Sequence, residues 1–421
     1  MQQPEWQKSG SQHIWMPYTQ MKTALPPLPV AGTAGCEILL TDGRRLIDGI
    51  ASWWTACHGY GHPHIVEAIK TQAETMSHVM FGGLQHEPAL RLAERLADFL
   101  PGDLSRVFFC DSGSVSVEVA LKIAVQYWMN LGRSGKKRFL CFVDSYHGDT
   151  VGAMSVCDPE DSMHSRFKGY ILEQYPHPLP RTEQELQLLE QFLNEHESQL
   201  AGAIIEPLLQ AACGMRTHSS QCLAKVAEQV QQRDLLLIAD EVATGFGRTG
   251  TMFACEQAGI VPDIICLSKA LTGGALGMGA TVARKYIFDA FFDDDASKAL
   301  MHGPSFMANP LACAAANASL DLFENEPRLQ QVRAIEEICR SRLAKLQEHP
   351  LVTEVRTLGA MAAIQCKQDL DKSAGMQIAI ENGVWLRPLR DVVYLMPPLT
   401  ISDQQLQQVC DVMVSIVESQ P

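Results

Sequence analysis

Short apolar runs alternate with helix-like periodicity from about residue 63 to residue 320 of this 421-residue chain, and this alternation limits the folds open to it. The apolar runs lie at residues 107–110, 139–142, 202–205, 235–239 and 264–267. Each run is bounded by turn residues and is apolar throughout, which is typical of strands buried on both faces of a parallel sheet. The pattern predicts an α/β fold with a mostly parallel central sheet covered by helices.

The sequence changes character near residue 321, which indicates a second domain. A charged helical segment at 326–348 is followed by strand-like runs at 355–358, 360–365, 384–387 and 392–395, and by a last helix at about 402–418. We expect residues 53–320 to form the large domain and residues 321–421 a smaller α+β domain. Residues 1–52 are expected to form an N-terminal arm and short strands that contribute to the small domain.

Composition restricts the partners and the compartment. The formal net charge of −14 argues against nucleic acid and anionic membrane surfaces as partners. No segment is apolar enough to span a membrane, and the polar start lacks the features of a signal peptide. The 13 cysteines include no C-x-x-C pair, and we expect reduced thiols in a cytoplasmic protein. His147 has no second ligand at metal spacing, so no metal is expected.

Two of the strand-like runs are each followed by a charged residue. Asp240 follows the run at 235–239, and Lys269 comes shortly after the run at 264–267. Open α/β sheets bind ligands at the carboxyl ends of their strands. An amine and a carboxylate placed there suit pyridoxal phosphate, because lysine forms its Schiff base and aspartate pairs with its pyridinium nitrogen. The alternative is that Asp240 caps a turn and Lys269 opens a surface helix, where the helix dipole disfavours a cation.

Small polar residues at 111–118 follow the run at 107–110 and begin a helix. A helix N-terminus in this position offers free N–H groups and a favourable dipole to an anion. Ordinary N-capping by Ser112 or Ser114 is an equally good interpretation, and the two roles are compatible.

Residues 245–250 (Gly-Phe-Gly-Arg-Thr-Gly) fit the G-x-G-x-x-G fingerprint and keep a nicotinamide or flavin oxidoreductase as an alternative. That fingerprint should directly follow a strand and open a helix, with an acidic residue ending the next strand. Here residues 241–244 intervene, and Asp263 precedes its run instead of ending it. A hydrolase is also disfavoured, since no G-x-S-x-G elbow occurs.

Residues 238–242, 245–250 and 268–274 together resemble the class III aminotransferases of fold type I, and the resemblance extends from about residue 13 to the last helix. It implies a pyridoxal-phosphate-dependent transaminase. Segments 13–15, 52–54, 76–83 and 394–398 are similar to the members that use S-adenosylmethionine to convert 8-amino-7-oxononanoate to 7,8-diaminononanoate in biotin biosynthesis. Lysine as donor, an ω-amino-acid or diamine transaminase, and a non-catalytic relative remain alternatives; intact Asp240 and Lys269 argue against the last.

The resemblance assigns the cofactor contacts. It implies that Lys269 binds pyridoxal phosphate covalently and that Asp240 pairs with its ring nitrogen. Gly113 and Ser114 are implied to contact the phosphate, and Tyr146 to stack on the ring and face the substrate.

Gly303, Pro304 and Ser305 are implied to reach the cofactor and substrate of the neighbouring subunit, which makes the expected assembly a homodimer with shared active sites. The family usually has threonine in place of Ser305, and either hydroxyl can bind a phosphate. The chain also departs from the family at residues 210–214, where relatives are richer in glycine.

Tyr18, Trp53, Trp54 and Arg387 are implied to complete the substrate pocket, with Tyr18 also acting in catalysis. Large apolar walls suit a long aliphatic substrate, and an arginine suits its terminal carboxylate. Without the resemblance, Arg387 would be interpreted as a surface residue beside Pro388.

Overall fold

The computed structural model describes residues 3–160 and 163–420, so residues 1–2, part of the start that argued against a signal peptide, lie outside it. Its central sheet has seven strands, in the order β4 (Leu104–Cys110), β12 (Gly279–Arg284), β11 (Ile264–Leu267), β10 (Leu236–Asp240), β7 (Leu200–Ile205), β5 (Arg138–Phe142) and β6 (Tyr175–His177). Only β12 runs antiparallel to its neighbours. The predicted α/β fold with a mostly parallel sheet is confirmed.

The sequence analysis did not anticipate β12 or the short strand β6. β12 begins with glycine and small residues, which weaken the strand signal. The position nevertheless requires glycine, because a Cβ on Gly279 would lie 2.5 Å from the carbonyl oxygen of Ser112. Close approach of the chain at the start of α5 therefore explains the weak pattern.

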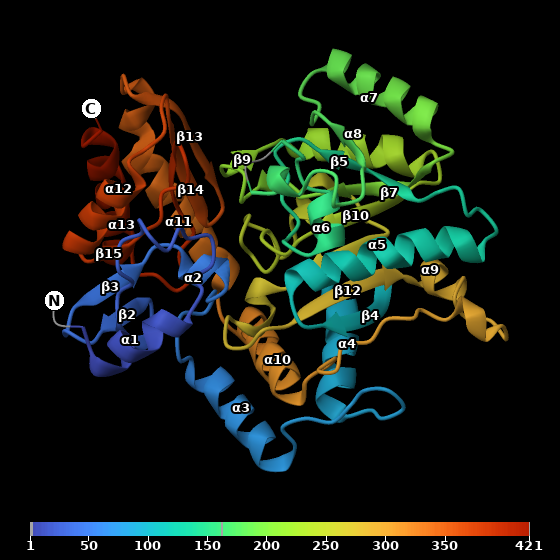
Figure 1. The fold of residues 1–421 in the computed structure, drawn as a ribbon, viewed down its shortest axis with the longest axis horizontal. Helices are drawn as coiled ribbons and strands as arrows, with labels where there is room; N and C mark the ends of the chain where they lie inside the picture. The colour runs from blue at the N-terminus through green and yellow to red at the C-terminus, as the bar shows by residue number, and fades with distance from the viewer. Residues whose placement is uncertain (1–2, 161–162, 421) are drawn as a thin grey trace.

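Helices bury both faces of the sheet. α5 (Gly113–Asn130) packs on one face in a cluster with Ile238 and Ile264, whereas α7 (Glu183–His196) and α8 (Ser220–Gln231) share a cluster with Leu237. In Figure 1, α7 and α8 lie at the top of the view, and α3 (Pro63–Thr75), α4 (Glu87–Phe99) and α10 (Pro310–Asn325) lie below. The shorter elements are α1 (Glu5–Gly10), α6 (Val151–Ser155), α9 (Lys285–Asp289), β8 (Leu209–Gln210) and β9 (Arg216–Thr217).

Two smaller sheets lie on the left of Figure 1. The N-terminal strands β1 (Val30–Ala34), β2 (Glu37–Leu40) and β3 (Arg45–Asp48) are joined by β15 (Val384–Trp385) from the far end of the chain. A second sheet contains β13 (Val352–Leu358), β14 (Met361–Cys366) and β16 (Val392–Leu395). The accompanying helices are α11 (Arg328–Leu343), α12 (Lys372–Glu381) and α13 (Asp403–Glu418). Among the described residues, we find no helix with the length and apolar character needed to cross a membrane.

The glycine-rich segment 245–250 forms turns that hold the C-terminal part of the chain against the central sheet. The Ala360 N–H donates to the Arg248 carbonyl at 2.9 Å, and Arg248 Nη1 donates to the Ala360 carbonyl at 3.0 Å. Gly359 packs so closely that a Cβ there would lie 2.4 Å from the Arg248 carbonyl oxygen. This packing role, with no helix opening at the glycines, removes the dinucleotide-binding alternative.

A left-handed turn connects β3 to the central part of the molecule. The four residues of α2 (Ala51–Trp54) have φ angles of 45°, 46°, 59° and 70°, although none is glycine. Left-handed backbone costs an L-residue about 1–2 kcal/mol, so this turn must be held by its surroundings. The sequence analysis gave no sign of it.

The contact between Gly359 and the Arg248 backbone leads to a stability prediction. Gly359→Ala should lower the free energy of unfolding by about 2–5 kcal/mol, since it adds overpacking to the cost of positive φ. Gly35→Ala is the matched control: Gly35 has φ of 56°, against 55° at Gly359, but open space around its Cβ position. The control should lose only about 1–2 kcal/mol in denaturant titrations. Equal losses would show that the close contact does not matter.

Candidate active site

Lys269 and Asp240 lie at the carboxyl ends of the neighbouring strands β11 and β10, as predicted. Lys269 begins a single 3₁₀ turn, not a long helix, and has a φ of 39°. Its amine lies 4.2 Å from the centre of the Trp54 ring. Burial lowers the pKa of Lys269 to about 8, against the opposing effect of Asp240 and Glu206. Because Lys269 begins only a four-residue 3₁₀ turn and its amine packs over the Trp54 ring, the structure does not support the alternative of a surface helix.

Asp240 is held in place by His147, a partner that the sequence analysis did not identify. Asp240 Oδ2 lies 2.7 Å from His147 Nδ1, and Oδ1 accepts the Val242 N–H at 3.1 Å. Both side chains are buried, and His147 Nε2 has no hydrogen-bond partner within the described chain. Among the described residues, no group of three or more His, Cys, Asp or Glu side chains is placed to hold a metal ion.

Glu206 is a second buried carboxylate of the site that was missed. It follows β7 and accepts the N–H groups of Tyr146 at 3.0 Å and Ala211 at 3.1 Å. Burial raises the pKa of Glu206 to about 7. Its position directly after a buried strand is the same signal that identified Asp240, so the sequence could have indicated it. The contact to Ala211 also defines the backbone at 210–214, where the chain departs from its family.

The start of α5 offers two N–H groups to an anion. Ser112 is the N-cap, because its Oγ accepts the Val115 N–H at 3.3 Å, and its carbonyl accepts the Ser116 N–H. The N–H groups of Gly113 and Ser114 are left for a bound anion. Ser114 Oγ instead accepts the Thr150 N–H at 3.0 Å, so capping and anion binding use different groups.

Tyr146 and Tyr18 meet at one wall of the site. Their hydroxyl oxygens are 3.1 Å apart, and the Tyr18 hydroxyl also donates to Asp149. The Tyr146 ring stacks on His164, with centroids 5.6 Å apart and planes inclined by 16°. Burial raises the pKa of Tyr18 to about 12, so its hydroxyl remains a proton donor. The sequence pattern did not single out Asp149 and His164.

The left-handed turn places two tryptophan rings against two cations. Trp54 faces the Lys269 amine, and the Arg387 guanidinium lies 5.1 Å from the centre of the Trp53 ring. Tyr18 meets Trp53 edge to face at 6.0 Å. No carboxylate of the described residues pairs with Arg387, so its bidentate face remains available to an acid.

Gly303, Pro304 and Ser305 do not join this cluster within one chain. Gly303 and Ser305 are exposed, and the neighbouring side chains contact α5 and the segment before α4. Lys122 Nζ donates to the Met301 carbonyl at 3.0 Å, and the Phe306 ring lies 4.7 Å from His78.

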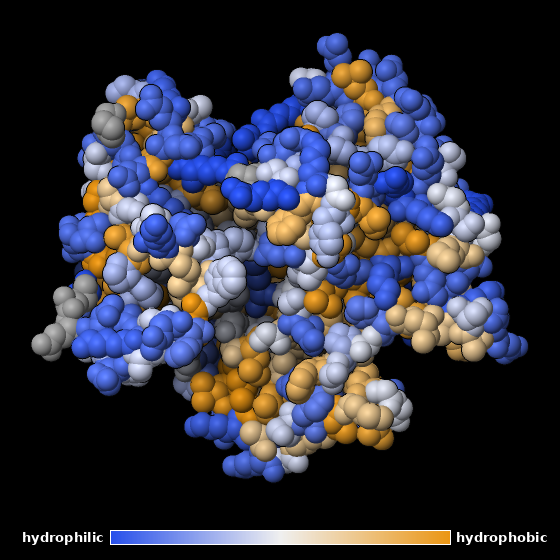
Figure 2. All heavy atoms as spheres, in the orientation of Figure 1, coloured by the Kyte–Doolittle hydropathy of each residue, from blue (hydrophilic) through white to orange (hydrophobic). Residues whose placement is uncertain are grey.

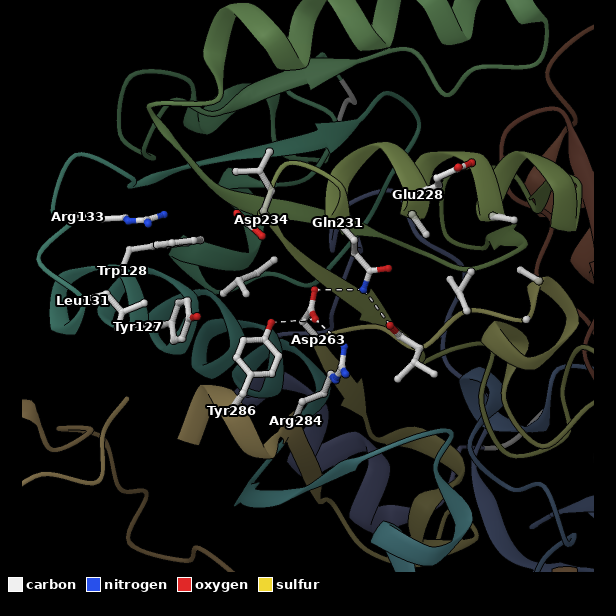
Figure 3. Close-up of a pocket in the computed structure, with 18 residues that line it drawn as sticks. Tyr127, Trp128, Leu131, Arg133, Glu228, Gln231, Asp234, Asp263, Arg284 and Tyr286 are labelled. Carbon is white, nitrogen blue, oxygen red and sulfur yellow. Dashed lines mark hydrogen bonds and ion pairs between the residues drawn. The ribbon is translucent and has the colours of Figure 1, made fainter. Parts of the chain in front are cut away.

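A separate cavity of about 760 Å³ opens at the opposite edge of the central sheet, near the starts of β10 and β11 (Figure 3). Its central carboxylate, Asp263, already accepts from Tyr286 at 2.9 Å and from the Leu237 N–H at 2.8 Å. None of the predicted site residues lines this cavity.

The residues fit pyridoxal phosphate. An amine with a lowered pKa, a fixed buried carboxylate and free N–H groups at a helix start match the aldehyde, the ring nitrogen and the phosphate of that cofactor. Gly113 also has no room for a larger residue, because a Cβ there would lie 2.7 Å from a Val242 methyl group.

Comparisons with known proteins agree with this chemistry. The class-III aminotransferase family model matches residues 18–417. The adenosylmethionine-8-amino-7-oxononanoate aminotransferase of Corynebacterium glutamicum is 41% identical, over 99% of this chain and 100% of that protein. The crystal structure of the Methanocaldococcus jannaschii enzyme of the same name has 32% identity and a TM-score of 0.94, with 98% of each chain covered. An amine transaminase from an uncultivated Pseudomonas species, solved in its PLP-bound form, has 30% identity and a TM-score of 0.89, over 96% of this chain and 98% of that one. The chain belongs to the class III aminotransferases.

Proposed function

We propose that the protein transfers an amino group from S-adenosylmethionine to 8-amino-7-oxononanoate, a step of biotin biosynthesis, with pyridoxal phosphate as cofactor. The observation that supports this substrate is the free guanidinium of Arg387 over Trp53, beside the Trp54 ring that faces Lys269. This arrangement offers an anchor for a carboxylate at one end of an apolar wall and an amine at the other. The similar proteins that are named adenosylmethionine-8-amino-7-oxononanoate aminotransferase favour the same assignment.

In this proposal each residue handles one part of the reaction. Bound pyridoxal phosphate supplies the electron sink. Gly113 and Ser114 bind its phosphate, and Asp240, held by His147, keeps a proton on its ring nitrogen. Lys269 binds the cofactor covalently and, once displaced by substrate, moves a proton between the substrate Cα and cofactor C4′. Its lowered pKa suits a group that both accepts and returns a proton near neutral pH.

A related ω-amino-acid or diamine transaminase is the second candidate, because an amine transaminase has the same fold at 30% identity. Lysine as amino donor is also open in this chemistry. The proton donors and acceptors around Tyr18, Tyr146 and Asp149 would contact the donor in either case. Half-reaction spectra with a panel of donors would separate these candidates.

We also propose a homodimer with shared sites. Exposed apolar side chains gather around the segment that includes Ser305: Met80, Leu84, Leu90, Met301 and Phe306 are each at least 47% exposed. Figure 2 shows apolar surface over the lower part of the molecule, where α3, α4 and α10 lie. A large apolar patch of this kind suits a subunit interface.

We propose that residues 53–320 form the large domain and residues 321–421 the small domain, to which residues 1–52 contribute. Pairing of β3 with β15 supports the placement of the N-terminal strands. A cytoplasmic location is also proposed, because all 13 cysteines are buried and none is in a disulfide in the described structure, which suits a reducing compartment.

Lys269 is expected to be the residue that carries the cofactor. Borohydride reduction of the purified protein followed by peptide mapping should place the pyridoxyl label on Lys269. Lys136 is an internal control, because burial also lowers its pKa but its amine donates to the Glu197 carbonyl at 2.7 Å. A label on Lys136 or Lys122 would contradict the assignment.

Arg387 is expected to bind the carboxylate of the keto acid. Arg387→Ala should weaken use of 8-amino-7-oxononanoate about ten- to a hundredfold, the loss of a charge-assisted pair worth about 1.5–3 kcal/mol. The half-reaction with S-adenosylmethionine should lose less. Arg390→Ala, at an exposed neighbouring position, is the control and should change neither half-reaction. Selective loss of the donor half-reaction would reverse the assignment.

Shared sites can be tested with mixed dimers. One subunit carries Lys269→Ala and the other Ser305→Tyr, whose bulk should block the site that Ser305 reaches. If Ser305 serves the neighbouring site, the mixed dimer has one undamaged site and should show about half of the native activity. If Ser305 serves its own chain, both sites are damaged, and activity should not exceed half of that of the Ser305→Tyr homodimer.

A further inference from the structure

Asp48 is a buried carboxylate just before the left-handed turn. It is fully buried at the end of β3. Its Oδ1 accepts the Ile50 N–H at 3.0 Å, and its Oδ2 accepts the Ser52 N–H at 2.8 Å and the Ser52 hydroxyl at 3.2 Å. The Tyr60 hydroxyl also donates to Oδ2. All four donors belong to the turn or to the residues immediately around it, and none is a cation.

The backbone beside Asp48 is fixed to the strand that precedes Arg387. The Gly49 N–H donates to the Trp385 carbonyl at 3.1 Å, and the Gly49 carbonyl accepts the Met396 N–H at 2.8 Å. A Cβ on Gly49 would lie 2.7 Å from a Leu386 methyl group. The backbone of residues 48–49 is therefore fixed to β15, and the Asp48 side chain is bonded to the turn.

The turn is unfavourable on its own, because four consecutive non-glycine residues have positive φ. The Asp48 carboxylate helps to offset this cost, because it accepts the N–H groups of Ile50 and Ser52 while the turn is in its left-handed form. The result is that the Trp54 face meets the Lys269 amine and the Trp53 face meets Arg387.

We propose that Asp48 is a positioning residue of the active site: it holds the left-handed turn that sets Trp54 against the Lys269 amine and Trp53 against Arg387. The Trp53 part rests on the proposed function, since Arg387 is the proposed substrate anchor. The Trp54 part rests only on Lys269 and the cofactor, so the two can fail separately.

The contact between Trp54 and the Lys269 nitrogen supplies a readout other than activity. The face of an aromatic ring favours the positively charged form of a nearby nitrogen. If the turn loosens, the pH midpoint in the absorbance titration of the cofactor-loaded protein should fall by about 0.5–1.5 pH units. A residue that only stabilises the fold would lower thermal stability without moving this midpoint.

Asp48→Asn is the first variant, because the amide nitrogen that replaces Oδ2 cannot accept the Ser52 N–H. It should shift the midpoint downward and raise KM for the keto acid about tenfold. Asp42→Asn is the charge control, since Asp42 is an exposed carboxylate in the β2–β3 connection. Loss of a negative charge alone should leave the midpoint of that variant unchanged.

Ser52 allows the geometry to be changed without changing any charge. Ser52→Val should shift the midpoint downward like Asp48→Asn, because a β-branched residue strongly disfavours the φ of 46° at this exposed position. Ser52→Gly adopts that φ freely and should leave the midpoint in place. In the double variant with Asp48→Asn, Ser52→Gly should restore at least half of the shift.

The outcomes are decisive in each direction. A shift in Asp48→Asn that Ser52→Gly does not reverse would mean that Asp48 acts through its charge, and the proposal would be wrong. If Asp48→Asn does not fold, the comparison of Ser52→Val with Ser52→Gly decides alone: equal midpoints overturn the proposal. A midpoint shift without a change in keto-acid KM would keep the role of Asp48 toward Lys269 and reject its role toward Trp53, whereas Arg387→Ala alone tests Arg387.

Discussion

Burial of charge at the carboxyl edge of the central sheet is the constraint on which the rest of this structure depends. Lys269, Asp240 and Glu206 lie at the carboxyl ends of three adjacent buried strands, and the two carboxylates are buried where water cannot stabilise their charges. Each needs a fixed partner: Asp240 has His147, and Glu206 has two backbone N–H groups. Within the described part of the chain, the amine of Lys269 has the Trp54 ring and the carboxylates of Asp240 and Glu206 nearby.

The strand-end positions could be predicted from sequence, because burial of a parallel sheet leaves a simple local pattern. Asp240 and Lys269 were found in this way, and Glu206 obeys the same rule. His147 could not be assigned to Asp240, since the two residues are 93 positions apart and only the tertiary fold brings them together. β12 escaped detection because the contact of Gly279 with the Ser112 backbone favours small residues over strand formers.

The two tryptophans proposed to line the substrate pocket were even harder to predict from sequence. Trp53 and Trp54 were recognised only through the family resemblance, and nothing local predicts positive φ in the segment Ala51–Trp54. The energy that holds this turn comes from Asp48 and from strand pairing with residues more than 300 positions away. Similarly, the glycine-rich segment 245–250 has a literal nucleotide-binding pattern, but its backbone packs closely against the hairpin at Gly359. A sequence motif indicates a local backbone conformation. The residues packed around it determine whether that conformation binds a ligand or serves packing.

The two shifted pKa values at the sheet edge are related. Burial raises the pKa of Glu206 to about 7 and lowers that of Lys269 to about 8, so both groups are displaced toward their neutral forms. Relative to the unfolded chain, the folded protein therefore holds the Glu206 proton more tightly between about pH 4.5 and 7, and this lowers stability as pH rises through that range. Lys269 acts in the opposite direction between about pH 8 and 10.5, where the unfolded chain holds the proton more tightly and stability rises with pH. Near neutral pH, both groups change protonation at a small cost in free energy. A group that takes a proton from a substrate and returns it gains from a pKa near neutrality, because neither direction of transfer is then strongly unfavourable.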